Sequence, residues 1–464
     1  MLHFRPKQWH IGDVHPYYEN GTLYLFYLIP NGVLRCDDCF KNPNHVVCKE
    51  GAVAITGDFC TWHEERLPNP VCSVLPWDGR FLGSRGTANG MTTMESSDLV
   101  TWREPMHDYT LALDTKAIPA GARDYSMFFD GDMQAPRATA TAYFSNEHNG
   151  FGTGMDCGVM ITGPLFQEGN AQRMLLHFPN AQVDLYQCKE PECSQMIHIG
   201  QRWVLLTSLA RQSVHWVGAP TYWLGETNTT IDSQDWNTLP AYQLDGEDLC
   251  AAQLTPYKDG YLLFGWIPLN YCGQEWGGHL NLPRVIYPLP DGRLASQLEP
   301  TYAKRIEGEK KYVDLHASTI TEDGVTVAAA QRYTNFGVHV DFAPQRTGAC
   351  GLRLDMDNGI CVEIDLAQQR MRIVSQGEGR KPFEFSSLKL FEDVVDKPLH
   401  LHVIFDEDIV EAFLNDQYAL CARVNVRSRE TRCAIFAPEK DAMLSFMTYE
   451  FSDEAKVYTP GLAI

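Results

Sequence analysis

The sequence lacks any uninterrupted apolar run that approaches the roughly 20 residues needed to cross a membrane. Residues 1–6 also lack the apolar core of a secretion signal. We therefore expect a cytoplasmic protein with no membrane partner. In that compartment the 14 cysteines are expected to be reduced thiols.

Basic residues are scarce as well. The chain has 38 Lys and Arg against 59 Asp and Glu, which gives a net charge of −21. Binding to a phosphate backbone depends on a basic patch that releases counterions. We therefore expect no nucleic-acid partner. A small, uncharged molecule is the expected ligand, and the oligomeric state is left open.

Long amphipathic helical patterns are hard to find, whereas strand patterns are common. Short aromatic and aliphatic runs, several of them preceded by turn residues, predict strands. These runs are residues 22–27, 138–144, 202–206 and 260–264. The sequence therefore predicts an all-β protein.

A faint repeat divides the first part of the chain. Residues 51–55 lead to Asp-Phe-Cys-Thr-Trp at 58–62, and residues 91–97 lead to Asp-Leu-Val-Thr-Trp at 98–102, with a third echo at 231–236. A period near 40 residues with several short strands is typical of propeller blades. We predict a five-bladed β-propeller as the catalytic domain over residues 1–305.

The segment 306–311 is charged and has no apolar periodicity, which predicts a short linker. Alternating runs follow it, for example at 351–355, 361–365 and 399–404, and they have the period of half-buried antiparallel strands. We predict a C-terminal β-sandwich domain over residues 312–464.

Three acidic residues, Asp13, Asp124 and Glu192, each lie where the flanking pattern predicts a strand or its end. Cleavage of a sugar acetal needs one carboxylate to attack and one carboxylic acid to protonate the leaving oxygen, and often a third acid to hold sugar hydroxyls. The three acids therefore indicate glycosidic chemistry.

The motifs around these acids follow an order shared with a known family. Residues 9–16 are an altered form of the family's Trp-Met-Asn-Asp-Pro-Asn-Gly motif, Arg123-Asp124-Tyr125 matches its Arg-Asp-Pro motif, and Glu192-Cys193 matches its Glu-Cys motif. The chain thereby resembles glycoside hydrolase family 32, the fructan and sucrose hydrolases built as a propeller and a sandwich. Weaker matches in the same order are Leu244-Asp245-Gly246 with Asp248, Trp276-Gly277-Gly278, Leu282-Pro283-Arg284 and residues 405–415.

The resemblance implies a role for each acid. Asp13 takes the place of the nucleophile, Asp124 that of the transition-state stabiliser, and Glu192 that of the general acid/base, with Glu190 in reserve. In a retaining double displacement the nucleophile and the acid/base lie about 5 to 5.5 Å apart. We expect Asp13 to stay ionised and the pKa of Glu192 to be raised, with Arg123 as the counter-charge.

The departures from the family motif concern the sugar. The family has asparagine before the nucleophile, where this chain has Gly12, and Val14-His15-Pro16 replaces Pro-Asn-Gly. The first subsite is therefore expected to differ from one that binds a usual terminal fructose. The side chains expected to bind substrate are those of Arg123, Trp77, Asp78, Ser84, His15, Trp266 and Trp276.

Structural readings compete with each of these assignments. Asp13 alone would be read as a turn aspartate, Asp124 beside Arg123 as a surface ion pair, and the tryptophans as packing between blades. With the motif order taken into account, we predict a retaining hydrolase of β-fructofuranosides or a closely related small furanoside. The alternatives are a fructosyl-transferring enzyme, an arabinofuranosidase-like enzyme, and a carbohydrate-binding protein without turnover.

A separate group of residues contains potential metal ligands. Cys36, Cys39, His45 and Cys48 have the donor types of a zinc site, but their spacing is short and irregular. Reduced loop cysteines are the favoured interpretation. We expect neither a metal ion nor a cofactor in the catalytic site.

Overall fold

The structure is a computed structural model and describes residues 1–7, 10–30, 48–87, 90–103, 122–131, 135–144, 156–165, 172–178, 190–210, 218–269, 276–321, 324–345, 348–355, 359–375, 383–424 and 430–457. In this part of the chain nearly all regular structure is β-strand, and one short α-helix, α2 (Pro300–Ile306), is described. None of the described helices is long and apolar enough to span a bilayer. The all-β prediction is confirmed.

Between His15 and Leu298 the described strands form five antiparallel sheets, which we call the N-terminal sheets. Four of them have four strands each, in chain order. These are β1 (His15–Glu19), β2 (Thr22–Pro30), β3 (Cys48–Thr56) and β4 (His63–Leu67); β5 (Ser73–Trp77), β6 (Arg80–Thr87), β7 (Gly90–Ser96) and β8 (Trp102–Arg103); β9 (Ala122–Phe128), β10 (Arg137–Phe144), β11 (Asp156–Thr162) and β12 (Gln172–Phe178); and β13 (Glu190–Ile199), β14 (Arg202–Ala210), β15 (Gly218–Leu224) and β16 (Ala241–Gln243).

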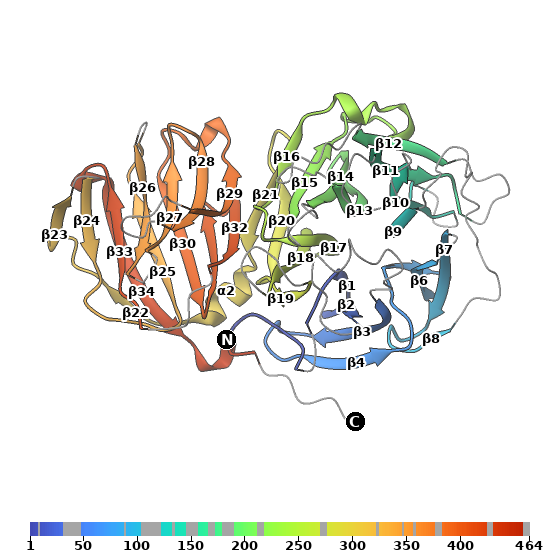
Figure 1. Ribbon diagram of the computed structural model, residues 1–464, viewed down its shortest axis with the longest axis horizontal. Helices are drawn as coiled ribbons and strands as arrows, with labels where there is room; N and C mark the ends of the chain where they lie inside the picture. Colours follow the sequence, from blue (N-terminus) through green and yellow to red (C-terminus); the bar gives the residue numbers. More distant parts are fainter. Residues whose placement is uncertain are drawn as a thin grey trace.

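The fifth N-terminal sheet has the order β17-β18-β20-β21, and β19 also pairs with β18. Its strands are β17 (Cys250–Tyr257), β18 (Gly260–Pro268), β19 (Gly278–Leu280), β20 (Arg284–Pro288) and β21 (Leu294–Leu298). The first strands of the five sheets contact one another in cyclic order: β1 with β5, β5 with β9, β9 with β13, β13 with β17, and β17 with β1. Figure 1 shows the five sheets arranged about a common centre.

The sequence repeat corresponds to a repeated turn between the third and fourth strands of the first two sheets. In both turns the aspartate, Asp58 or Asp98, accepts hydrogen bonds from the backbone N–H groups two and three residues later, at 2.6 to 3.0 Å. The indole N–H of Trp62 or Trp102 donates to the carbonyl three residues earlier, at 3.1 and 3.2 Å. The third echo differs, because Trp236 donates to a carbonyl five residues earlier.

Two larger antiparallel sheets follow, which we call the C-terminal sheets, and they lie to one side of the N-terminal sheets in Figure 1. Both contribute to a single hydrophobic core, in which Val338 and Phe405 meet Leu352 and Ile364. The six-stranded sheet has the order β22 (Glu307–Tyr312), β34 (Met443–Phe451), β25 (Phe336–Phe342), β30 (Leu399–Asp406), β31 (Ile409–Leu414) and β32 (Tyr418–Arg423). The seven-stranded sheet has the order β23 (Ser318–Thr321), β24 (Gly324–Ala328), β33 (Cys433–Ala437), β26 (Ala349–Leu354), β27 (Ile360–Asp365), β28 (Arg370–Ser375) and β29 (Phe383–Lys389).

The linker predicted at 306–311 is wrong, because these residues form the end of α2 and most of β22. Strand β22 lies at the edge of its sheet and pairs only with β34 among the described strands. Its residues are charged and mostly exposed, as is common for edge strands, and this hid the strand from a search for apolar periodicity.

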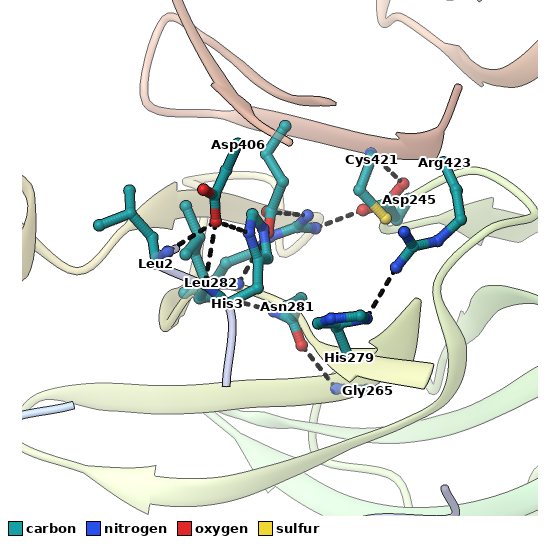
Figure 2. Close-up of polar contacts among 12 residues, drawn as sticks. Leu2, His3, Asp245, Gly265, His279, Asn281, Leu282, Asp406, Cys421 and Arg423 are labelled. Atoms are coloured by element: carbon teal, nitrogen blue, oxygen red, sulfur yellow. Dashed lines mark hydrogen bonds and ion pairs between the residues drawn. The ribbon is translucent and has the colours of Figure 1, made fainter. Parts of the chain in front are cut away.

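Buried charges join the C-terminal sheets to the N-terminal sheets. Arg284 is fully buried and forms ion pairs with Asp245 and with Glu411 of β31. His3 lies between Asp406 and Glu411, with ring nitrogens 2.8 and 3.0 Å from their carboxylate oxygens, and Figure 2 shows His3 and Asp406 facing each other. Removing one partner of such a network leaves a buried charge without compensation, which costs about 3 to 5 kcal/mol. Several of the weaker motif matches in the sequence therefore have a structural role at this interface.

A second contact extends the same interface. Arg423 in β32 donates its backbone N–H to Asp248 at 2.9 Å and a guanidinium N–H to Nδ1 of His279 at 2.7 Å. Figure 2 shows Arg423 and His279 reaching toward each other from the two groups of sheets. Each group of sheets thus supplies partners for the buried charges of the other.

Candidate active site

The three predicted acids lie at the starts of the first strands of three different sheets. Asp13 precedes β1, Asp124 is the third residue of β9, and Glu192 is the third residue of β13. The charges of Asp124 and Arg123 act on Asp13, and Arg123 bonds to Glu192, so these starts lie close together. Burial, followed by the charges of all three acids, raises the pKa of the Cys193 thiol well above its usual value. The charges of the three acids therefore act on one shared location.

The local backbone at these positions is unusual. Asp13, Asp124 and Cys193 adopt left-handed conformations, with φ of 45°, 56° and 50°. Non-glycine residues rarely do so, and each such position costs of order 1 to 3 kcal/mol. In β9 and β13 the pairing with the next strand also shifts register close to the acid. A bulge of this kind redirects a side chain away from the regular alternation of the strand.

The same combination of a left-handed residue and a register shift occurs in β17. Ala251 has a φ of 48°, and the pairing of β17 with β18 shifts between Cys250 and Gln253. The fold therefore provides a comparable position in the fifth sheet, where the side chain is only a methyl group.

Arg123 connects two of the acids. Its Nη2 donates a hydrogen bond to Oε1 of Glu192 at 2.7 Å, and its Nε lies 3.5 Å from Oδ2 of Asp124. The backbone N–H of Cys193 donates to the same Asp124 oxygen at 3.4 Å. The three charged side chains are 20 to 33% exposed, so they are accessible to a ligand. The guanidinium of Arg123 therefore lies between the carboxylates of Asp124 and Glu192.

The third acid, Asp13, has a shifted pKa. Burial and the negative charge of Asp124 raise its pKa to about 7, against the opposing effects of Arg123 and the Trp266 side chain. The expectation that Asp13 is fully ionised at neutral pH therefore does not hold for the ligand-free protein.

Two tryptophan side chains, Trp266 and Trp276, pack next to the segment that carries Asp13. A Cβ at Gly12 would stand 2.5 Å from the ring of Trp276, so no larger residue fits there without displacing that ring. The rings of Trp276 and Trp266 lie 5.9 Å apart, and both side chains are almost fully buried. The departure of Gly12 from the family motif thus has a physical cause, since Trp276 occupies the space of the missing side chain.

His15 lies two residues beyond Asp13 and lines a cavity of about 280 Å³ between the first strands of the N-terminal sheets. Its Nδ1 is 2.9 Å from Oε1 of Gln253. Burial lowers the pKa of His15 to about 4, so the ring is neutral at physiological pH. Gln253 also donates to the carbonyl of Cys193 at 3.2 Å and so ties β1, β13 and β17 together. No pattern in the sequence indicated that Gln253 belongs to the site.

The other predicted substrate contacts lie elsewhere. Ser84 is fully buried, 2.6 Å from the Ser73 hydroxyl, and donates to the carbonyl of Tyr125 at 3.1 Å, so it links β6 to β5 and β9. This hydroxyl therefore holds strands together and is not exposed to a sugar.

Trp77 and Asp78 lie at the far end of β5. The start of this strand is near the acids, because burial and the charges of Asp124 and Asp13 raise the pKa of Cys72 to about 12. Trp77 lies five residues after Cys72, which corresponds to about 16 Å at the usual rise of a strand. The Trp77 ring stacks on Phe129. Asp78 is an exposed residue of the hairpin turn, with a φ of 43°. The geometry does not bring either residue to the acids.

Some predicted residues fall outside the part of the chain that the structure describes. These are Trp9 of the first motif, the side chains of Glu190 and Cys48, and the possible zinc ligands Cys36, Cys39 and His45.

No family model matches this chain, and no curated protein does so either. Solved structures do match. The sucrose-6-phosphate hydrolase of Lactobacillus gasseri is 14% identical, with a TM-score of 0.67, over 98% of this chain and 93% of the other. The fructan 1-exohydrolase IIa of Cichorium intybus, solved with 1-kestose, is 12% identical, with a TM-score of 0.68, over 99% and 98%. A glycoside hydrolase family 32 protein of Bifidobacterium adolescentis is 14% identical, with a TM-score of 0.63, over 98% and 82%. At the level of the fold, the resemblance to glycoside hydrolase family 32 is confirmed over nearly the whole chain.

Proposed function

We propose that the protein is a retaining glycoside hydrolase that acts on small β-fructofuranosides or closely related furanosides. The observation that carries this proposal is the convergence of Asp13, Asp124 and Glu192 at the starts of three neighbouring first strands. The fold supports it, since the matching structures include a sucrose-6-phosphate hydrolase and a fructan exohydrolase.

In the proposed reaction the ionised Asp13 attacks the anomeric carbon while Glu192 protonates the leaving oxygen. Water then hydrolyses the glycosyl-enzyme, with Glu192 acting as base. Asp124 stabilises the oxocarbenium-like transition state through the sugar hydroxyls. Arg123 orients Glu192 through its 2.7 Å hydrogen bond and compensates the charge of the acids.

Trp276 is proposed to shape the first subsite. With Gly12 in place of the asparagine that the family resemblance implies, no side-chain amide is available before Asp13 to bind a sugar hydroxyl. The Trp276 ring fills that space instead, with Trp266 packed beside it.

We further propose that the five N-terminal sheets are the blades of a closed five-bladed β-propeller over residues 1–305. The cyclic contacts of β1, β5, β9, β13 and β17 support this arrangement. The two C-terminal sheets with their shared core would then be the β-sandwich domain over residues 312–464. The cytoplasmic location stays a prediction.

A screen of fructosyl and arabinosyl substrates, with product analysis in the presence and absence of acceptor sugars, tests the proposal. Release of fructose with retained configuration is the expected result. Release of arabinose alone would favour an arabinofuranosidase, and transfer products would favour a transferase.

A carbohydrate-binding protein without turnover is the remaining alternative, and the raised pKa of Asp13 together with the altered first motif favours testing it. We expect Asp13→Asn and Glu192→Gln each to abolish hydrolysis. Asp78→Asn, at the far end of β5, is the matched control and should keep full activity. Sugar binding that persists in the wild-type protein without any product would favour the binding protein.

A further inference from the structure

A second cluster of chemically active side chains lies in the C-terminal sheets, away from the acids. Glu307 begins β22, His339 lies in β25, and His402 lies in β30. One potential ligand atom from each residue lies within 4.8 Å of the other two. His339 and His402 are direct cross-strand partners, and their rings are 4.0 Å apart. The register of the sheet therefore places two imidazoles and a carboxylate together.

The cluster is open to a cavity. A pocket of about 410 Å³ is lined by all three residues, and its other walls come from α2 and from the neighbouring strands of both groups of sheets. The side chains of Glu307 and His339 are 18% and 25% exposed. An ion or a water molecule can therefore reach Glu307 and His339 from solvent.

A hydrogen bond with Tyr449 orients the ring of His402. The Nε2 of His402 is 2.7 Å from the hydroxyl of Tyr449, which leaves its Nδ1 for another partner. Metal-binding histidines usually have such a partner on the second ring nitrogen. Gly337 makes room for this tyrosine, because a Cβ there would stand 2.0 Å from the Tyr449 ring.

We propose that Glu307, His339 and His402 form a binding site for a divalent transition-metal ion such as Zn²⁺, with its fourth position open to the cavity. Two imidazoles and one carboxylate are a ligand set that suits zinc. Tetrahedral zinc holds its donors about 3.3 Å apart. His339 therefore exchanges its 2.7 Å hydrogen bond to Glu307 for the metal, and the two rings rotate out of their near-parallel stack. The ion would join β22, which follows α2, to β25 and β30.

Calorimetric titration of the full, metal-free chain with Zn²⁺ tests the site, with thermal unfolding as a second measurement. We expect one zinc ion bound per chain and a higher unfolding temperature with zinc than without it. Glu307→Gln and His339→Gln should each weaken zinc binding at least about tenfold and remove the thermal shift. His400→Gln is the control, because His400 lines the same cavity but pairs with Asp341 outside the cluster.

A further variant separates this site from the cysteines near the N-terminus. The Cys36→Ser/Cys39→Ser protein should bind zinc as the wild type does. The proposal is overturned if the wild-type protein binds no zinc, if Glu307→Gln binds it as tightly as the wild type, or if the cysteine variant loses all binding.

Discussion

The guanidinium of Arg123 donates a hydrogen bond to Glu192 at 2.7 Å while its Nε lies 3.5 Å from Asp124. One cation thereby serves two carboxylates that come from different sheets. Its charge also reaches Asp13, whose pKa it lowers against the larger effects of burial and Asp124. Arg123 therefore links the orientation of the proposed acid/base to the ionisation of the proposed nucleophile.

Replacing this residue tests the link. We expect Arg123→Gln to reduce kcat/KM about a hundredfold or more, as loss of a positioned charge in an active site does. Because Arg123 lowers the pKa of Asp13, its loss should raise that pKa and move the acid limb of the pH profile to higher pH. A profile of kcat/KM from pH 4 to pH 9 measures both effects, and a limb at lower pH than in the wild type would contradict this account.

Ionisation of Asp13 should cost stability. The folded protein holds the proton up to about pH 7, whereas an unfolded aspartate releases it near the ordinary value of 3.8. Stability therefore falls as pH rises between these values. Asp13→Asn cannot ionise, so it should be more stable than the wild type at pH 8, by at most about 4 kcal/mol, and similar at pH 4. Thermal unfolding at both pH values measures this, with Asp78→Asn as a control that should show no such difference.

Gly12 and Trp276 should be energetically coupled. Gly12→Ala forces a methyl group to within 2.5 Å of the indole, and overpacking of this kind costs about 1 to 3 kcal/mol. Trp276→Ala removes the obstacle, so adding Gly12→Ala to it should cost much less. A double-mutant cycle on the free energy of unfolding gives the coupling. Additive costs would show that the two residues do not constrain each other.

Arg284 should be indispensable for the interface. Arg284→Met leaves Asp245 buried without its cation and Glu411 with His3 alone, at a cost of about 3 to 5 kcal/mol. The exposed pair of Arg80 and Glu95 provides a control, since Arg80→Met should cost less than about 1 kcal/mol. Urea unfolding of the two variants compares these values, and equal costs would mean that the buried network contributes little.

Local patterns were sufficient to predict the strands. The runs at 22–27, 138–144, 202–206 and 260–264 all lie within strands of the structure, because apolar and aromatic runs bounded by turns have few other stable forms. The order of the motifs likewise drew attention to three acids that lie at the starts of first strands, and their catalytic roles stay predictions. Both signals depend on residues that are close in sequence or fixed in order.

Contacts between distant segments could not be predicted. Trp77 and Ser84 lie close in sequence to residues near the acids, yet one is at the far end of its strand and the other is enclosed between strands. The contact of Gly12 with Trp276 joins segments more than 250 residues apart, and the pairing of His339 with His402 depends on the register of two strands. A single sequence does not show which of these distant residues are in contact.

The backbone at Ala251 repeats the left-handed bend found at Asp13 and Asp124, but it carries an inert side chain. The main chain of β17 is therefore already shaped to present a functional group, whether or not the residue has one. A single substitution there would place a different side chain on the same bend and leave the rest of the strand unchanged.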